Sequence, residues 1–194
     1  MERCDISFLS DAADNLDFGI EPSTIDCQIE KCLFNSKDDV VSEIIKTIET
    51  ARSSIYVMHF WFSWKPIADA LITAHKKGVK VNVLTDQRSL VKYMQDSQTT
   101  YSISVPEHLS DNGIEKLAVH FKDLMHHKVI ISDDVVILGS LNLFRQSIHE
   151  NTENIIFIKS KIVCEFYRKE FESIFQTSLN LQSAINATKD QPRD

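Results

Sequence analysis

Residues 126–142 read HHKVIISDDVVILGSLN, and this stretch determines which fold and which chemistry we expect. His126 and Lys128 stand two apart at the start of an apolar run typical of a strand, so their side chains share one face. Asp133-Asp134 predicts a tight turn before a second apolar strand. Gly139-Ser140-Leu141-Asn142 then joins that strand to a helix start. The sequence therefore predicts a hairpin whose polar end carries a functional site.

The side chains at this end suit a phosphate diester. The imidazole of His126 can attack phosphorus and form a phosphohistidine, which splits one difficult displacement into two easier ones. Lys128 can hold the non-bridging oxygens and offset the negative charge of the transition state. Ser140 and Asn142, with backbone N–H groups of a helix start, complete a predicted anion-binding cradle. His127 is expected to point the other way and to be structural.

The order of these residues resembles the HxK(x)4D…GSxN signature of the phospholipase D superfamily. In that family the counterpart of Asp133 closes the first half of the signature and is often structural. Five residues separate Asp133 from Gly139 here, where the family generally has six, and a hairpin turn absorbs such a shortening. The resemblance also implies Glu153 as the carboxylate partner of the imidazole, because it precedes an apolar strand. A capping carboxylate on a loop is the alternative interpretation of Glu153.

Two branches of the superfamily are most similar to this chain, the Zucchini-type mitochondrial nucleases and the bacterial Nuc endonucleases. The similarity runs from about residue 25 to residue 177. The stretches that carry it are 55–86, 125–128, 139–142, 146–148, 153–154 and 166–171. The membrane anchor and a convincing zinc-binding insert of the Zucchini type are missing, so the chain is more similar to a soluble bacterial relative.

The resemblance implies a homodimer, because single-motif members of this branch join their two motifs across a two-fold axis. It implies a metal-independent phosphodiesterase without cofactor, in which one His126 attacks and the partner's His126 protonates the leaving oxygen. The favoured activity is an endonuclease acting on DNA or RNA, with single strands preferred. A phospholipase D-type lipid hydrolase and a catalytically silent nucleic-acid-binding scaffold are the alternatives.

Aromatic and basic residues outside the motif are candidate substrate contacts. Trp64 stands at a helix start and is expected to be exposed, where it can stack on a base for about 1–3 kcal/mol. Phe60 and Phe62 are expected to fill the core. The candidate phosphate contacts are Arg88, Lys92, Lys122 and Arg145.

Periodicity predicts the α/β class with a largely parallel central sheet. The resemblance implies a phospholipase D-like sandwich, with a mixed, largely parallel central sheet flanked by helices on both faces. Residues 1–22 are expected to form an N-terminal arm, 23–178 the catalytic domain, and 179–194 a polar, disordered tail. A short helix over 89–94 and a long polar connection over 95–112 are expected between the third and fourth strands. Besides the hairpin, strands are expected at 24–34, 54–62, 79–85, 116–121 and 154–159, and helices at 39–53, 65–77, 141–148 and 161–176.

Composition sets wider limits. The 194 residues, 43% of them hydrophobic, can bury one proper core. A net charge of −7 argues against a broad basic face for nucleic acid, but not against basic residues that converge on one groove. Cys27 and Cys32 are expected to be reduced thiols, with half of a metal site together with His59 or His75 as the alternative. The sequence has neither a signal peptide nor an apolar run of membrane length, so we expect a cytoplasmic protein without stable membrane association.

Overall fold

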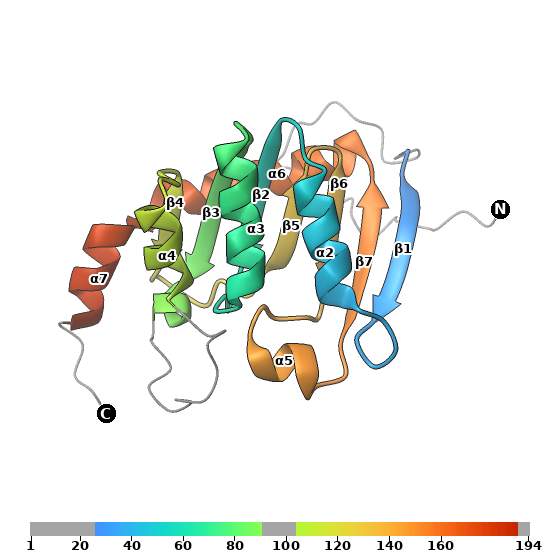
Figure 1. Cartoon of the computed structure of the whole chain (residues 1–194). Coiled ribbons are helices and arrows are strands. Elements are labelled where there is room, and N and C mark those ends of the chain that lie inside the picture. Colours follow the sequence, from blue (N-terminus) through green and yellow to red (C-terminus); the bar gives the residue numbers. More distant parts are fainter. Residues whose placement is uncertain (1–25, 91–103, 190–194) are drawn as a thin grey trace, which may run out of the picture.

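The computed structural model describes residues 26–90 and 104–189, which form one eight-stranded sheet with helices against it (Figure 1). The strands are β1 (Gln28–Phe34), β2 (Ser54–His59), β3 (Lys80–Asp86), β4 (Leu117–His120), β5 (Lys128–Ser132), β6 (Val135–Gly139), β7 (Asn154–Lys159) and β8 (Leu179–Asn180). The α-helices are α2 (Val40–Glu49), α3 (Lys65–Lys76), α4 (Val105–Asp111), α5 (Arg145–His149), α6 (Lys161–Thr177) and α7 (Leu181–Lys189), and the 3-10 helix η2 spans Gln87–Leu90. The expected N-terminal arm lies outside the described residues.

The strand order across the sheet is β1-β7-β6-β5-β2-β3-β4-β8. β2, β3 and β4 run parallel to one another, as the strand–helix–strand pattern predicts. The five other pairings in the described residues are antiparallel, so the sheet is mixed but not largely parallel. The share of parallel strand pairs is lower than expected because the β5–β6 hairpin lies beside β2. In addition, β1 and β8 form the two edges of the sheet in antiparallel orientation. Periodicity along the chain does not fix these distant partners.

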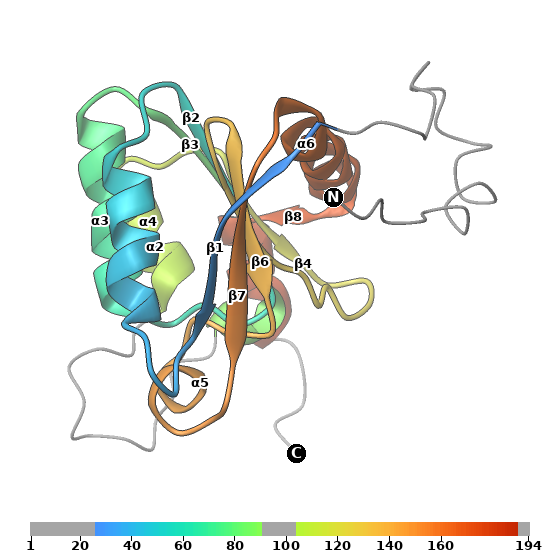
Figure 2. The ribbon, with the colours of Figure 1, turned by 90° about the vertical axis from the view of Figure 1, so that its right-hand side faces the viewer.

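Helices cover both faces of the sheet, which confirms the expected class and layering. Figure 2 views the sheet edge-on, with α2, α3 and α4 on one face and α6 on the other. Adjacent residues of β2 alternate between two cores: Val57 packs with the first group of helices, and Met58 packs with Phe171 of α6. Because both faces are buried, the central strands are apolar almost throughout.

Local sequence explains where the helices begin and end. The Asp39 carboxylate caps α2 by accepting a hydrogen bond from the backbone N–H of Ser42 at 3.1 Å. Pro66 lies in the first turn of α3, and Gly78 follows the end of that helix with a φ of +91°, where glycine avoids strain. The side chains that helical spacing buries in α2 are Val40, Ile44 and Ile48.

Two stretches expected to be irregular are regular. Residues 105–111, part of the expected polar connection, form α4 and bury Val105 and Leu109. The expected disordered tail is wrong for residues 179–189, because β8 pairs with β4 and α7 buries Ala184 in the core. The expected helix over 89–94 overlaps η2 at residues 89–90, and its remainder lies outside the described residues. Within residues 26–90 and 104–189, no helix combines the length and apolar character that crossing a bilayer requires.

Candidate active site

Strand register brings the predicted residues to one end of the sheet. β2 ends at His59, which pairs with Lys128 at the start of the antiparallel strand β5. β6 ends at Gly139, which pairs with Ile155 near the start of β7. β3 runs parallel to β2 and ends on the same side. The segments before β5, after β6 and before β7 therefore meet at the end of the sheet where α5 lies (Figure 1).

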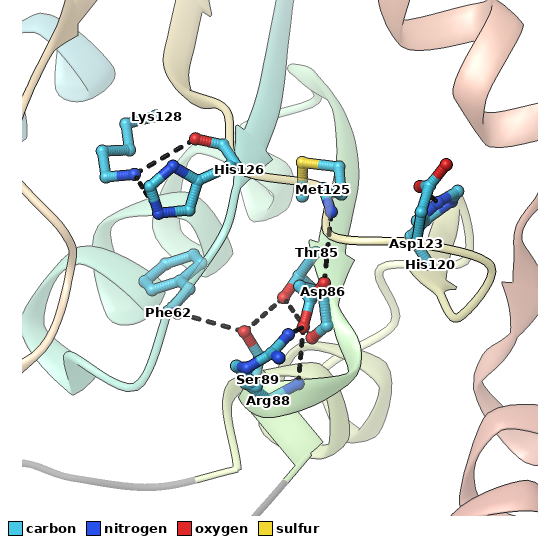
Figure 3. Close-up of polar contacts among 10 residues, drawn as sticks. All are labelled: Phe62, Thr85, Asp86, Arg88, Ser89, His120, Asp123, Met125, His126 and Lys128. Atoms are coloured by element: carbon cyan, nitrogen blue, oxygen red, sulfur yellow. Dashed lines mark hydrogen bonds and ion pairs between the residues drawn. The ribbon is translucent and has the colours of Figure 1, made fainter.

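His126 and Lys128 are in direct contact. The Lys128 ammonium donates a hydrogen bond to the backbone oxygen of His126 at 3.1 Å, and its Nζ lies 3.3 Å from the imidazole Nε2 (Figure 3). The imidazole packs against the ring of Phe60, with the ring centroids 4.5 Å apart. His126 is exposed and Lys128 is half-buried. An exposed imidazole beside an ammonium fits a nucleophile next to an anion-binding group.

The surroundings of His126 favour its neutral form. Partial burial of the ring contributes most to lowering its pKa, followed by the positive charges of Lys128 and Arg88. A nucleophilic imidazole must be unprotonated, so this shift supports attack at neutral pH. Burial also lowers the pKa of Lys128, and the negative charge of Glu153 opposes that shift.

Ser140 and Glu153 form the second part of the site. The Ser140 hydroxyl donates to the Glu153 carboxylate and accepts from the backbone N–H of Asn154 at 3.1 Å. Buried Glu153 also accepts from Ser147 Oγ at 2.7 Å and from Asn151 Nδ2 at 3.0 Å. Burial alone would raise the pKa of Glu153, but the hydrogen bonds from Ser140, Ser147 and Asn151 outweigh it and lower the pKa.

The position of Glu153 corrects its expected role. Within the described residues no hydrogen bond joins Glu153 to His126, and the carboxylate accepts from Ser140, Ser147 and Asn151. Glu153 instead fixes Ser140 after β6 and places negative charge near Lys128. The chain therefore uses this carboxylate to order the anion-binding loop, and the expected imidazole–carboxylate pair is not formed within one subunit.

Asn142 contributes an unsatisfied acceptor. Its backbone N–H donates to Ser147 Oγ at 2.9 Å, which places the residue beside the Glu153 network. Its side-chain Oδ1 is buried and has no hydrogen-bond partner among the described residues.

Asp133 lies away from the site. It follows β5 at the end of the strand opposite to Lys128, in a turn where its φ is +52°. Its carboxylate accepts hydrogen bonds from the backbone N–H groups of Arg52 at 2.7 Å, Ser53 at 3.0 Å and Ser54 at 2.9 Å. Asp133 therefore ties the β5–β6 turn to the start of β2. Its inclusion among the catalytic residues is wrong, because strand β5 separates it from the reacting groups.

Phe60 lies at the centre of the site, although we expected it in the core. β2 ends at His59, so strand alternation no longer governs the following residues: Phe62 is fully buried and Phe60 is half-buried. The Arg88 guanidinium carbon and the Lys128 ammonium each lie 5.2 Å from the centroid of the Phe60 ring. Arg88 is thus close to the predicted reacting groups. An aromatic residue directly after a strand end was the signal that could have identified Phe60.

The other predicted substrate contacts differ in their exposure and in their contacts. Trp64 is only 7% exposed, because it packs against His149 of α5 with ring centroids 5.2 Å apart, so the expected exposure is wrong. Lys122 is exposed in the segment that leads to β5. Arg145 is exposed on α5 and forms an ion pair with Glu150 at 2.7 Å. Lys92 lies outside the described residues.

The alternative metal site is not formed by the residues proposed for it. In the part of the chain that the structure describes, no three His, Cys, Asp or Glu side chains gather as metal ligands. Cys32 lies on the outer strand β1 and Cys27 directly before it, both as exposed free thiols, whereas His59 is buried at the end of the central strand β2. The two cysteines and His59 or His75 therefore do not form a coordination sphere here.

Residues 44–175 match the family model described as "Cardiolipin synthase, PLD-like domain". The chain belongs to the phospholipase D superfamily. Members of the phospholipase D superfamily are phosphodiesterase enzymes, so the expected enzyme class is confirmed. The matched range includes every residue that forms the site, from Phe60 to Glu153.

Curated relatives in this superfamily are similar over most of the chain. A mitochondrial cardiolipin hydrolase of Xenopus tropicalis is 29% identical over 158 residues, which cover 81% of this chain and 71% of the relative. The mouse protein of the same name is 30% identical over 161 residues, covering 81% and 66%. A phospholipase D of Rickettsia prowazekii is 34% identical over 136 residues, covering 70% and 62%.

Solved structures confirm the phospholipase D-like fold. Nuc from Salmonella typhimurium, a phospholipase D family member, superimposes with a TM-score of 0.67 at 22% identity, covering 80% of this chain and 98% of that chain. NucT from Helicobacter pylori superimposes with a TM-score of 0.65 at 18% identity, covering 80% and 100%. Together with the family match and the similarity to mitochondrial cardiolipin hydrolases, this confirms the predicted similarity to the single-motif branch of the superfamily.

Proposed function

We propose that the chain is a metal-independent endonuclease that cleaves single-stranded DNA or RNA through a phosphohistidine intermediate. The observation that carries this proposal is the exposed His126 imidazole, whose Nε2 lies 3.3 Å from the ammonium of Lys128. Phe60 and Arg88 lie beside this pair and add an aromatic face and a second cation. Aromatic and cationic side chains that lie together are typical of proteins that bind single strands.

The reaction follows from these groups in two displacements. An imidazole nitrogen of His126 attacks phosphorus, and the bond to the leaving oxygen breaks as the new P–N bond forms. Lys128 offsets the charge on the non-bridging oxygens in both steps. Water then attacks phosphorus, the P–N bond breaks, and His126 is regenerated. Because the imidazole itself is the nucleophile, the displacement does not require a metal-bound hydroxide.

The leaving oxygen needs a proton, which we assign to the partner's His126 in a homodimer with a two-fold axis through the site. That histidine then accepts the proton of the attacking water in the second step. The exposure of His126 leaves its imidazole accessible to a second copy of the chain. Because both histidines act in one site, the pH dependence belongs to the coupled pair.

Hydrolysis of a phospholipid diester is the second candidate. The relatives from Xenopus tropicalis and mouse are named for cardiolipin, and the rickettsial relative is a phospholipase D. Leu124, two residues before His126, is 52% exposed, and an exposed apolar side chain near the nucleophile suits contact with acyl chains. We favour the nuclease because the Phe60 ring contacts the His126 imidazole, with centroids 4.5 Å apart, and the Arg88 guanidinium carbon lies 5.2 Å from the centroid of the same ring.

One parallel assay separates these candidates. The purified protein is incubated with EDTA and, separately, with single-stranded DNA, single-stranded RNA, duplex DNA and phospholipid vesicles. We expect cleavage of a single strand in the presence of the chelator. Activity that is lost on chelation and restored by a divalent ion refutes metal independence, and cleavage of vesicles alone refutes the nuclease.

A pair of adjacent histidines provides the matched control. His126→Ala should lower cleavage by about a thousandfold or more, since the nucleophile is lost. His127→Ala should leave cleavage within about twofold, because the His127 imidazole lies 3.5 Å from the carboxylate of Glu170 on α6. Retained cleavage by His126→Ala refutes the mechanism. A protein that is monomeric by light scattering at assay concentration refutes the shared site.

A further inference from the structure

A buried carboxylate lies behind the candidate active site. Asp86, the last residue of β3, is 0% exposed, and its Oδ1 accepts from the backbone N–H of Arg88 at 3.1 Å and from Arg88 Nη1 at 2.7 Å. Its Oδ2 accepts from the backbone N–H of Met125 at 3.3 Å (Figure 3). A buried charge is tolerated only when it is paired and hydrogen-bonded. Asp86 therefore joins Arg88 to the segment that carries His126.

The turn that carries Arg88 is also fixed on its other side. Buried Ser89 accepts hydrogen bonds from the Thr85 hydroxyl and from the backbone N–H of Phe62, the latter at 3.1 Å. Phe62 belongs to the segment that follows β2 and carries Phe60. The turn of Arg88 is thus held on two sides, by Asp86 to the segment that carries His126 and by Ser89 to the segment that carries Phe60. A long side chain held in this way loses little further freedom when it binds a ligand.

The guanidinium of Arg88 is fixed but still accessible. Its side chain is 44% exposed, although one N–H is committed to Asp86. Its carbon lies 5.2 Å from the centroid of Phe60, and the His126 imidazole contacts the same ring at 4.5 Å. Figure 3 shows Arg88 apart from the contact between His126 and Lys128, and no hydrogen bond joins it to either. Arg88 is therefore a second cationic group beside the reacting centre, not part of it.

We propose that Arg88 binds the phosphate that flanks the scissile phosphate, so that the enzyme recognises two consecutive phosphates of a single polynucleotide strand. This proposal rests on the proposed nuclease function. Lys128, in contact with His126, takes the scissile group, and Phe60 spaces Arg88 from it. The free edge of a guanidinium matches two oxygens of one phosphate. A phospholipid with one diester offers no second phosphate, whereas each internal linkage of a polynucleotide has neighbours. Cardiolipin carries two diesters joined through one glycerol, so it is the lipid that the test must include.

Substrates that differ by one phosphate test this subsite. The value of kcat/KM is measured for the thymidine dinucleotide with a single internucleotide phosphate, for the trinucleotide with two, and for the matching ribonucleotides. Cleavage of cardiolipin vesicles is measured in parallel. Arg88→Gln should lower kcat/KM for the trinucleotide about tenfold or more relative to the dinucleotide, as expected for one charge-assisted hydrogen bond. Arg88→Lys should restore part of this preference, because it keeps the charge. Arg52→Gln is the control, since exposed Arg52 lies at the Asp133 end of the sheet.

The possible results of these measurements support or overturn the subsite and the nuclease function separately. A selective loss on the trinucleotide in Arg88→Gln, with Arg52→Gln near wild type, supports the subsite. Equal losses on both substrates, or no loss on either, overturn the subsite while leaving the nuclease intact. A wild-type protein that cleaves none of the nucleotides refutes the proposed function and the subsite with it. Loss confined to cleavage of cardiolipin vesicles would assign Arg88 to a lipid phosphate and overturn the polynucleotide assignment.

Discussion

Replacing Asp133 with alanine is expected to destabilise the fold by about 3–5 kcal/mol and to leave the chemistry of the folded enzyme intact. The residue occupies the D position of the family signature, yet its carboxylate accepts three backbone N–H groups at 2.7, 3.0 and 2.9 Å. These bonds tie the β5–β6 turn to the residues that lead into β2. The perturbation therefore separates a structural role from a catalytic one.

The magnitude follows from these contacts and from the backbone. Each hydrogen bond to a charged acceptor contributes about 1.5–3 kcal/mol. The Arg52 and Ser53 donors are exposed and can bind water after the substitution, so the three hydrogen bonds together contribute about 2–4 kcal/mol. The φ of +52° adds about 1 kcal/mol for alanine. Asp133→Gly removes the carboxylate without the backbone strain, so it should be about 1 kcal/mol more stable than Asp133→Ala.

The contribution of Asp133 to the stability of the fold depends on pH in a direction that its pKa shift defines. Burial opposes ionisation of Asp133, but the hydrogen bonds from Ser54, Arg52 and Ser53 outweigh it and lower its pKa. The carboxylate thus stabilises the fold above the unfolded pKa of about 3.9, and this contribution is lost as pH falls through the lower folded value. The stability difference between wild type and Asp133→Ala should therefore shrink only in strong acid.

Urea unfolding and cleavage kinetics of the same preparations check this reasoning. The free energy of unfolding should drop at pH 7, and kcat per folded molecule should stay within about twofold of wild type. A fall of about a hundredfold in kcat with unchanged stability would refute the structural assignment of Asp133.

Three further substitutions have effects whose direction follows from the structure. A Cβ at Gly139 would lie 2.1 Å from the Asn154 backbone oxygen, so Gly139→Ala should lower the free energy of unfolding by about 2 kcal/mol or more. Gly78 has open space around it but a φ of +91°, so Gly78→Ala should lower the free energy of unfolding by only about 1 kcal/mol. Losses of similar size for the two variants in urea unfolding would contradict this. Arg88→Gln removes a positive charge that lowers the pKa of His126, so the acidic limb of the pH profile of kcat/KM should move to higher pH. A shift to lower pH would show that Arg88 does not act on His126.

Sequence reasoning was most successful where the signal was local. The hairpin turn at Asp133-Asp134, the strand over 154–159 and the α2 stripe of Val40, Ile44 and Ile48 each follow from spacing and turn chemistry within a few residues. The contact between His126 and Lys128 follows in the same way, because the two residues are two apart at a strand start.

Distant partners explain what the sequence could not predict. Trp64 looked exposed at a helix start, but α5 covers it from about eighty residues further along the chain. Phe60 looked like core, but β2 ends one residue earlier and turns its ring toward His126. Glu153 was expected to pair with the imidazole, but Ser140 and Ser147 donate to it instead. Such outcomes depend on strand register and on loop contacts, which no single window of sequence contains.

Strand β8 has a consequence for how the protein is handled. Its two residues lie along β4 as the outermost strand, with Ala118 and Val119 of β4 opposite them. Removing the chain from residue 179 onward would leave the N–H and C=O groups of β4 unpaired along an apolar edge. Such an edge accepts a strand from a neighbouring molecule and starts aggregation. A truncated protein would then associate through β4 for reasons unrelated to catalysis, so light scattering belongs on the untruncated chain.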